Sequence, residues 1–474
     1  MNMYARYIGL IILSIAFNGC QAQEKAEKVK EVIAPGYKID ITVNNFAGAR
    51  VTLANYFGEK PYKADSATVE NGHFVFEGEE ALPQGMYLVV LPPKSTYFEI
   101  IVGEDQHFSL QTDTLNFVSN MKVEGSEENE VFYKDLVYLA DQRAKVNEIQ
   151  EELKTVEKDS DRYKELVESR NQVNTEVMTY REELMNSKPD HLYPKMLRTM
   201  KEPTVPPAPD GADSLYAFHY YRAHFFDNVD LNDQRLLRTP ILHQKIDTYI
   251  ERLTYKHPDS INKSIDYIIG QTQDTLIFRY LVQTFLNKYA ASKIMGMDAV
   301  YVHMVEHYYM KGLAYWSDQE NLEKMTERAL SISPTLIGRK APGFSMQDMN
   351  GKMVSLHDIK AKYTILYFWD YDCGHCKKVT PQLAEAYKKY IDKDVQLVTV
   401  SINGAIDIWK EKVAEYGIKG IPLADPYRKS GFDAKYDIRS TPRLFLLDED
   451  KIIKAKHITV EQMEELLDRL LGDS

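Results

Sequence analysis

Cysteine is scarce in this chain of 474 residues, which contains only Cys20, Cys373 and Cys376. The last two form one Cys-x-x-Cys pair, so no framework of structural disulfides is available and the domain cores must provide the stability. A structural zinc site needs about four ligands, and no second Cys-x-x-Cys exists to complete one. We therefore expect no metal ion and no other cofactor.

An excess of positive charge is also missing. Lys and Arg number 58 against 70 Asp and Glu, which gives a formal net charge of −12. Because no basic patch stands out, we expect no nucleic-acid partner, and the acidic balance indicates mainly solubility. At this length, with 44% hydrophobic and 27% charged residues, the chain should fold into about two to four globular domains.

A long hydrophobic run is absent from the N-terminus. The apolar run at 8–17 is shorter than the roughly 20 residues that span a bilayer, but it suits the core of a signal peptide at 1–19. Asn18-Gly19-Cys20 then resembles a bacterial lipobox, in which the cysteine is lipidated, although Phe17 and Asn18 depart from the usual residues. The alternative is cleavage after Ala22, which would leave a soluble protein.

Both interpretations export the chain. Because Cys20 has no other partner, we favour lipid attachment there and a charged, polar tether over 20–36. This predicts a protein of the cell envelope or periplasm that is anchored to a membrane through its N-terminal lipid.

Short alternating runs indicate an all-β sandwich or barrel over 37–125. The expected strands lie at 37–43, 50–56, 68–69, 73–76, 86–91, 96–102 and 107–111. Asn71-Gly72, between two such runs, predicts a type I′ hairpin. No site is visible in this part, so its function is expected to be that of a scaffold or docking module.

Helical periodicity takes over at 126–335, which predicts an all-α region. Two apolar stripes, at 146–156 and 163–184, are separated by Asp159-Ser160-Asp161 and predict an antiparallel helical hairpin. Further helices are expected at 216–227, 236–253, 261–269, 276–289 and 298–310. The last one contains the zinc-hydrolase pattern His-x-x-Glu-His at 303–307, but no third ligand can be assigned, so we favour a purely structural helix.

Strand and helix signals alternate in the last unit, 336–474. Strands are expected at 364–369, 395–401, 444–447 and 452–456, and helices at 376–391, 405–416, 429–436 and 460–471. This order is that of an α/β sandwich of thioredoxin type. Cys373 and Cys376 fall between a strand and a helix start, where the helix dipole stabilises a thiolate.

Several motifs make residues 337–474 resemble the TlpA/ResA type of extracytoplasmic thiol–disulfide oxidoreductases. These motifs are Gly338 to Phe344, Asn350-Gly351-Lys352, Leu356, Phe368-Trp369, Pro381 and Ser440-Thr441-Pro442. The whole layout is similar to bacteroidete lipoproteins with an N-terminal β domain and a helical middle. Two departures are Tyr367, where plain thioredoxin has a buried Asp, and Asp372, where Trp is common. Proton transfer is therefore expected to use water, His375 or another acid.

The resemblance implies roles for the residues of the motif. Cys373 would be the nucleophile, Cys376 the resolving cysteine and the pair a redox-active disulfide, with His375 adding positive charge. Pro442, in a cis peptide bond after Thr441, would present a backbone edge to the substrate, while Trp369 and Pro381 support the site. The partners would be thiols and disulfides of exported proteins and a membrane electron donor.

The direction of the reaction stays open at this point. The family favours a reductase. The Gly-His dipeptide between the cysteines is the one found in disulfide isomerases, and it favours an oxidant or isomerase. A scaffold lipoprotein with a dispensable redox domain is a further alternative. A thiol peroxidase would need a Pro-x-x-x-Thr-x-x-Cys loop, and 369–372 contains neither Pro nor Thr.

Overall fold

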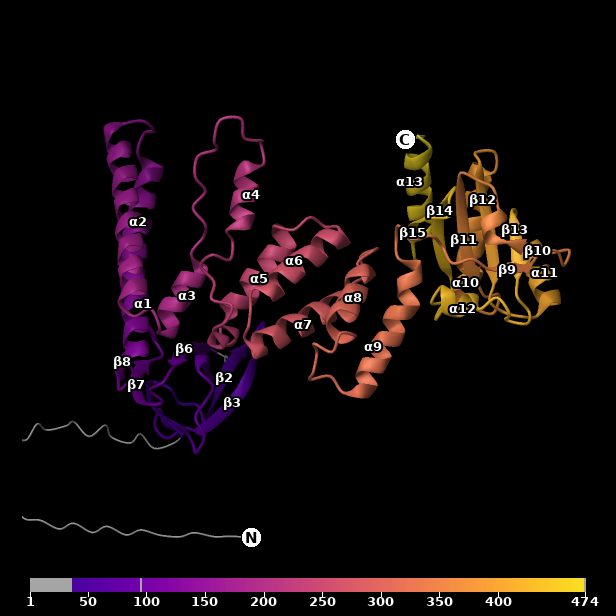
Figure 1. Ribbon diagram of the computed structural model, residues 1–474. Helices are drawn as coiled ribbons and strands as arrows, with labels where there is room; N and C mark the ends of the chain where they lie inside the picture. Colours follow the sequence, from indigo (N-terminus) through magenta and orange to yellow (C-terminus); the bar gives the residue numbers. More distant parts are fainter. Residues whose placement is uncertain (1–35, 94–95, 473–474) are drawn as a thin grey trace, which may run out of the picture.

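The computed structural model describes residues 36–93 and 96–472. They form an N-terminal pair of β-sheets, a central helical region and a C-terminal α/β unit, as the sequence predicts (Figure 1). The expected signal peptide, the lipidation site Cys20 and the tether up to residue 35 lie outside the described residues.

The N-terminal part is a sandwich of two four-stranded sheets. One sheet has the order β4 (His73–Gly78), β1 (Tyr37–Asn44), β7 (His107–Asp113), β8 (Lys122–Glu124), and the other has the order β3 (Lys60–Thr68), β2 (Arg50–Phe57), β5 (Gly85–Leu91), β6 (Thr96–Val102). Alternate residues of β1, namely Ile39, Ile41 and Val43, are fully buried in the core between the sheets. The period of two in the sequence therefore marks the inward face.

The Asn71-Gly72 turn has the expected backbone, with φ of 53° and 82°, and it closes a short hairpin with one antiparallel bridge, between Glu70 and His73. The N–H groups of Glu70 and His73 each donate to the other residue's carbonyl, and the flanking strands then part. Strand β3 pairs with β2, whereas β4 pairs with β1 of the other sheet. The hairpin prediction therefore holds at the turn but not along the strands, because a two-residue turn fixes only local geometry and β4 buries Phe74 and Phe76 by pairing with β1.

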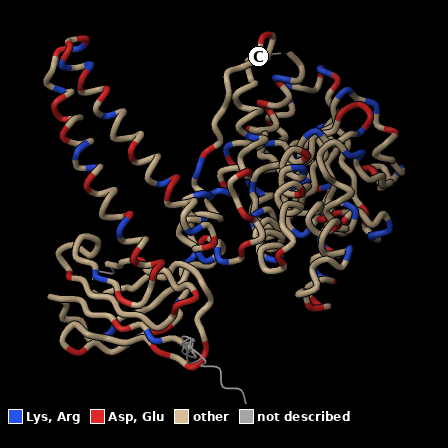
Figure 2. The backbone as a smooth tube through the Cα atoms, turned by 60° about the vertical axis from the view of Figure 1, so that its left-hand side comes forward, with Lys and Arg blue, Asp and Glu red and all other residues tan. Residues whose placement is uncertain are grey.

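The helical region begins with a long hairpin of α1 (Glu127–Thr155) and α2 (Asp161–Ser187), which projects from the β-sandwich (Figures 1 and 2). The hydroxyl of Ser160 caps α2 by accepting from the N–H of Tyr163. The other helices are α3 (Leu192–Met200), α4 (Tyr216–Ala223), α5 (Pro240–Arg252), α6 (Pro258–Gly270), α7 (Thr275–Ala290), α8 (Asp298–Met304) and α9 (Gln319–Ile332). The single helix expected at 236–253 is divided into a 3₁₀ turn and α5, because Pro240 suits a helix start.

The His-x-x-Glu-His segment belongs to this helical core. Helix α8 continues into one π-helical turn, Val305–Tyr309. The Nε2 atom of His303 lies 2.8 Å from a carboxylate oxygen of Asp266, and the hydroxyl of Tyr308 donates to the same oxygen over 2.7 Å. The rings of His303 and His307 stack 4.1 Å apart. These contacts are those of a structural helix.

The C-terminal unit has one seven-stranded sheet with β11 near its centre. The order is β10 (Met353–Ser355), β9 (Ser345–Gln347), β13 (Ile421–Ala424), β12 (Val395–Ser401), β11 (Tyr363–Trp369), β14 (Arg443–Asp448), β15 (Ile453–Lys456). Strand β11 is parallel to β12 and antiparallel to β14. Both faces of β11 are buried, as its continuous apolar run indicates.

Helices cover both faces of this sheet. Tyr367 and Trp369 pack against α10 (Gly374–Tyr387), α11 (Ile406–Glu415) and α13 (Val460–Leu471). Leu366 and Phe368 point to the opposite core, where α12 (Phe432–Lys435) contributes Phe432. This arrangement places the start of α10 at the end of the central strand.

Direct contacts join the helical region to the C-terminal unit. The guanidinium of Arg339 donates to the hydroxyl of Ser333, which directly follows α9, over 2.8 Å. Lys456 of β15 forms an ion pair with Asp298 at the start of α8. The hydroxyl of Ser331 in α9 donates to Asp437 over 3.2 Å. The helical region therefore lies against the loop that precedes β14.

Candidate redox site

The two cysteines lie where β11 passes into α10. A tight turn follows Trp369, in which the N–H of Asp372 donates to the Asp370 carboxylate over 2.9 Å and that of Cys373 to the Asp370 carbonyl over 3.2 Å. Cys373 is the N-cap of α10, with φ −71° and ψ 120°. Its side chain therefore stands at the positive end of the helix dipole.

Exposure distinguishes the two thiols. The side chain of Cys373 is partly exposed, whereas Cys376 is fully buried in the core beside Tyr367 and Trp369. The N–H of Asp370 donates to the sulfur of Cys376 over 3.5 Å. Both residues are free thiols in this structure. One sulfur is thus open to a substrate and the other can be reached only from within the site.

The pKa values of the two thiols are shifted in opposite directions from that of an ordinary cysteine. Burial alone would raise the pKa of Cys373, but hydrogen bonds from the N–H groups of Cys376 and His375 and from the side chain of Thr441 bring it below the usual thiol value. Burial raises the pKa of Cys376 to about 11. At neutral pH the thiolate, which is the reactive form, is therefore concentrated on Cys373.

The Thr441–Pro442 peptide bond is cis, as the resemblance implies. The thiol of Cys373 lies 3.5 Å from the carbonyl oxygen of Thr441, to which it donates. This contact brings together residues that are 68 positions apart in the chain. Pro442 therefore belongs to the loop beside Cys373.

The other expected site residues have different surroundings. His375 is exposed, and it acts on the pKa of Cys373 through its backbone N–H. Trp369 is fully buried, with its ring 5.9 Å from that of Tyr416. Pro381 lies inside α10. Trp369 can therefore support the site from the core, and Pro381 from within α10.

Thr380 is a residue of the site that the sequence did not reveal. Its hydroxyl lies 3.0 Å from that of Tyr367, and both side chains are buried beneath the cysteines. Burial, with the charges of both cysteines adding to it, raises the pKa of Tyr367 well above its usual range. Tyr367 is therefore a neutral hydroxyl and cannot accept a proton as a carboxylate does. Only the position of Thr380 four residues after Cys376 could have suggested it.

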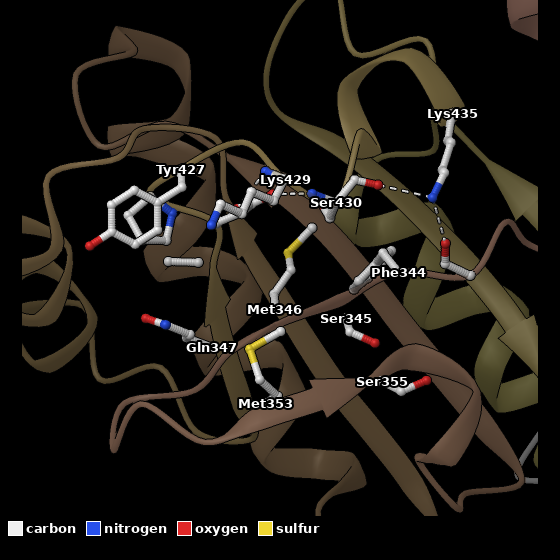
Figure 3. Close-up of a pocket in the computed structure, with 14 residues that line it drawn as sticks. Phe344, Ser345, Met346, Gln347, Met353, Ser355, Tyr427, Lys429, Ser430 and Lys435 are labelled. Atoms are coloured by element: carbon white, nitrogen blue, oxygen red, sulfur yellow. Dashed lines mark hydrogen bonds between the residues drawn. The ribbon is translucent and has the colours of Figure 1, made fainter.

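A cavity of about 670 Å³ lies elsewhere in the C-terminal unit (Figure 3). Phe344, Met346 and Met353 line one side, and Tyr427 and Lys429 approach from the loop after β13. The ammonium group of Lys435 donates to the carbonyls of Gly343 and Ser430, over 3.1 and 2.9 Å. Neither cysteine lines this cavity, so the thiol chemistry is not located there.

Two further observations concern the described part of the chain, 36–93 and 96–472. It holds no group of three or more His, Cys, Asp or Glu residues that could bind a metal ion. Within the same residues, none of the helices combines the length and the apolar character needed to cross a membrane.

The relative reactivity of the thiols gives a pH-dependent prediction. In the Cys20→Ser variant, iodoacetamide at pH 7 is expected to modify Cys373 and to leave Cys376 unmodified. The rate should rise as the Cys373 proton is lost and level off below pH ~8.5, the pKa of an ordinary cysteine. Peptide mapping by mass spectrometry across a pH series measures which cysteine is modified and how the rate of modification depends on pH. Equal labelling of the two thiols, or a midpoint above that of an ordinary cysteine, would contradict the assignment.

Comparison with known proteins assigns this unit to a family. Residues 337–456 match the AhpC/TSA family, while residues 37–132 and 160–331 match two domains of unknown function, DUF4369 and DUF5106. Over 136 residues the chain is 33% identical to the thiol-disulfide oxidoreductase ResA of Bacillus anthracis. The matched region is 28% of this chain and 76% of the ResA protein.

A second ResA protein shows a similar match. The ResA protein of Bacillus thuringiensis subsp. konkukian is 35% identical over 138 residues, which is 28% of this chain and 78% of that protein. A crystal structure of a domain of a possible thiol-disulfide isomerase from Cytophaga hutchinsonii is 35% identical, covers 30% of this chain and 97% of its own, and has a TM-score of 0.28. With the thioredoxin-like fold of its C-terminal unit, the chain belongs to the TlpA/ResA-like family of thiol–disulfide oxidoreductases.

Proposed function

We propose that this protein is an exported reductase of protein disulfides, tethered to a membrane through a lipid on Cys20. The observation that carries the redox assignment is the contrast between a partly exposed Cys373 with a lowered pKa and a fully buried Cys376 with a pKa of about 11. This contrast suits a nucleophile and a resolving thiol. Export and tethering are supported by the pattern of residues 8–20.

The reaction takes place in two exchanges. The Cys373 thiolate attacks one sulfur of a substrate disulfide, that S–S bond breaks, and the other substrate sulfur leaves as a thiolate that takes up a proton. Cys376 then loses its proton and attacks the Cys373 sulfur. The second substrate thiol is released, and a Cys373–Cys376 disulfide forms. The substrate gains two electrons from the protein. A membrane electron donor later supplies two electrons that reduce the Cys373–Cys376 disulfide to the dithiol form.

Proton transfer from Cys376 needs an acceptor. Tyr367 stays neutral because its pKa is raised by burial, so it cannot be that base. The departing substrate thiolate, or water at the mouth of the site near His375, is the acceptor that remains. The hydroxyls of Tyr367 and Thr380 hold the floor of the site in place.

The loop at Thr441 and Pro442 is proposed to bind the substrate chain. The 3.5 Å contact from Cys373 to the Thr441 carbonyl supports this role, since it brings backbone groups of the loop close to the nucleophile. A substrate segment can pair with such backbone groups as an added strand. Proline also has no N–H to direct at the sulfurs.

A disulfide oxidant or isomerase is the second candidate, and one observation favours it. A lower pKa of Cys373 stabilises the dithiol form, which makes the disulfide form a stronger oxidant. Family resemblance favours the reductase, because the partners in the compartment set the direction of electron flow together with the potential.

Direction can be tested by two single-turnover measurements on the same preparation. The dithiol form is mixed with insulin, and the disulfide form with reduced, unfolded ribonuclease. We expect insulin reduction to be the faster reaction, followed by insulin precipitation and by conversion of the protein to its disulfide form. Faster oxidation of ribonuclease would establish the oxidant instead, and absence of both reactions would leave only a scaffold role.

A further inference from the structure

A second pocket, of about 410 Å³, lies between the helical region and the C-terminal unit. One wall comes from the connection between α7 and α8, at 292–296, and from α9. The other wall comes from the loop before β14 and from the end of β15. We call this space the interdomain pocket.

Positive charge dominates the interdomain pocket. Its lining contains Lys293, Arg328, Arg439, Arg443 and Lys456, but only two carboxylates, Asp298 and Asp437. Each carboxylate is already paired: Asp298 with Lys456, and Asp437 with Arg439 over 2.7 Å. Among the described residues, the other three cations have no ion-pair partner. In a chain of net charge −12, such a surplus is a local feature that attracts anions.

Two of the three cations without an ion-pair partner, Arg328 and Arg443, contact neutral groups. The guanidinium of Arg328 lies 5.0 Å from the ring centroid of Tyr301. That of Arg443 donates to the carbonyl and hydroxyl of Ser440 over 3.1 and 2.7 Å. A guanidinium positioned in this way keeps its full charge and loses little conformational freedom when it binds a carboxylate.

The pocket lies beside the redox site. Arg439 and Arg443 each lie two residues from Thr441, whose carbonyl accepts from Cys373. Just after β15, the N–H of His457 donates to the Leu444 carbonyl over 2.7 Å. The loop that contacts the nucleophile, at Thr441, is therefore flanked on both sides by residues of the pocket.

His457, at the edge of this space, adds no charge to it. Burial, together with Arg443 and Lys456, lowers its pKa to about 4, although Asp298 and Asp437 act in the opposite direction. The imidazole is therefore neutral at physiological pH, and the charge of the pocket comes from its Lys and Arg residues alone.

We propose that the interdomain pocket binds acidic side chains next to the reacting cysteine, so that the preferred substrates are polypeptide disulfides flanked by Asp or Glu. This inference rests on the proposed function. A polypeptide fits better than a small free anion because Ile294 and Met295, 68% and 47% exposed, add an apolar rim to the charged pocket. The helical region would then take part in substrate recognition.

Two disulfide peptides that differ only in three flanking residues, Glu in one and Gln in the other, test this proposal. We expect the full-length dithiol form to reduce the Glu peptide with a kcat/KM ~10-fold higher than the Gln peptide, because each partly exposed ion pair adds a modest contribution to binding. High salt should remove the preference. The preference for the Glu peptide should become smaller in Arg328→Gln and, separately, in Lys293→Gln, both of which change exposed residues. It should be unchanged in Lys410→Gln, on the exposed surface of α11.

The outcomes separate the two proposals. Uncharged hydroxyethyl disulfide reports the thiol chemistry alone and shows whether each variant is folded and active. If wild type reduces neither this compound nor either peptide, the proposed function fails. If it reduces both peptides equally, or if the preference survives in both Arg328→Gln and Lys293→Gln, the recognition role of the pocket is wrong while the reductase function stands.

Discussion

Replacing Cys373 by serine is expected to lower disulfide reduction by about three orders of magnitude or more, to the limit of the assay. A serine hydroxyl stays protonated at neutral pH and is a poor nucleophile toward sulfur, so the first exchange cannot begin. The substitution changes one atom at a partly exposed helix N-cap, a position where serine is favoured, and the fold should be retained. Insulin precipitation and hydroxyethyl disulfide reduction measure the loss.

The third cysteine provides the matched control. Cys20→Ser removes a cysteine elsewhere in the chain and should leave both rates unchanged. Activity of Cys373→Ser equal to that of wild type would mean that the redox chemistry does not use this residue.

Replacing Cys376 by serine is expected to trap substrates on the protein as mixed disulfides. Cys373 can still attack a substrate, but no second thiol is left to release it, so mixed disulfides accumulate. Because Cys376 is fully buried, a substrate thiol cannot take its place in the site. The trapped partners can be recovered under non-reducing conditions from cells that express the variant, and mass spectrometry identifies each one and its bonded cysteine.

The variant that lacks both thiols, Cys373→Ser with Cys376→Ser, is the control for this capture. It should retain no partner through a reducible bond. Equal recovery with both variants would show that the captured proteins bind elsewhere, and no recovery with Cys376→Ser would count heavily against a general oxidoreductase.

Local patterns in the sequence predicted much of the C-terminal unit. The continuous apolar run of β11 indicated a strand buried on both faces, and the helix at Val460–Leu471 was expected with these limits. Strand β3 was missed over most of its length because its residues from Lys60 to Ala64 are all exposed and show no alternation of apolar and polar side chains. Its ladder with β2 is formed by backbone groups, on which the identity of the side chains has little influence.

The parts of the redox site that lie within short sequence motifs could be predicted. The Cys-x-x-Cys pair and Ser440-Thr441-Pro442 could be recognised as patterns, and the structure places Thr441 next to Cys373. The interdomain pocket could not be anticipated, because Lys293, Arg328 and Arg443 come from three separate stretches of the chain. Only the packing of the helical region against β15 brings those charges together.

The most direct test of the central claim is the disulfide itself. The Cys20→Ser protein is equilibrated in glutathione buffers of graded potential, quenched with acid and mapped by mass spectrometry. We predict one reversible two-electron transition, in which a dithiol peptide becomes a peptide with an intramolecular Cys373–Cys376 disulfide, and its loss in Cys373→Ser. If both thiols persist, or if only mixed disulfides with glutathione form across the whole range, the pair is not a redox centre.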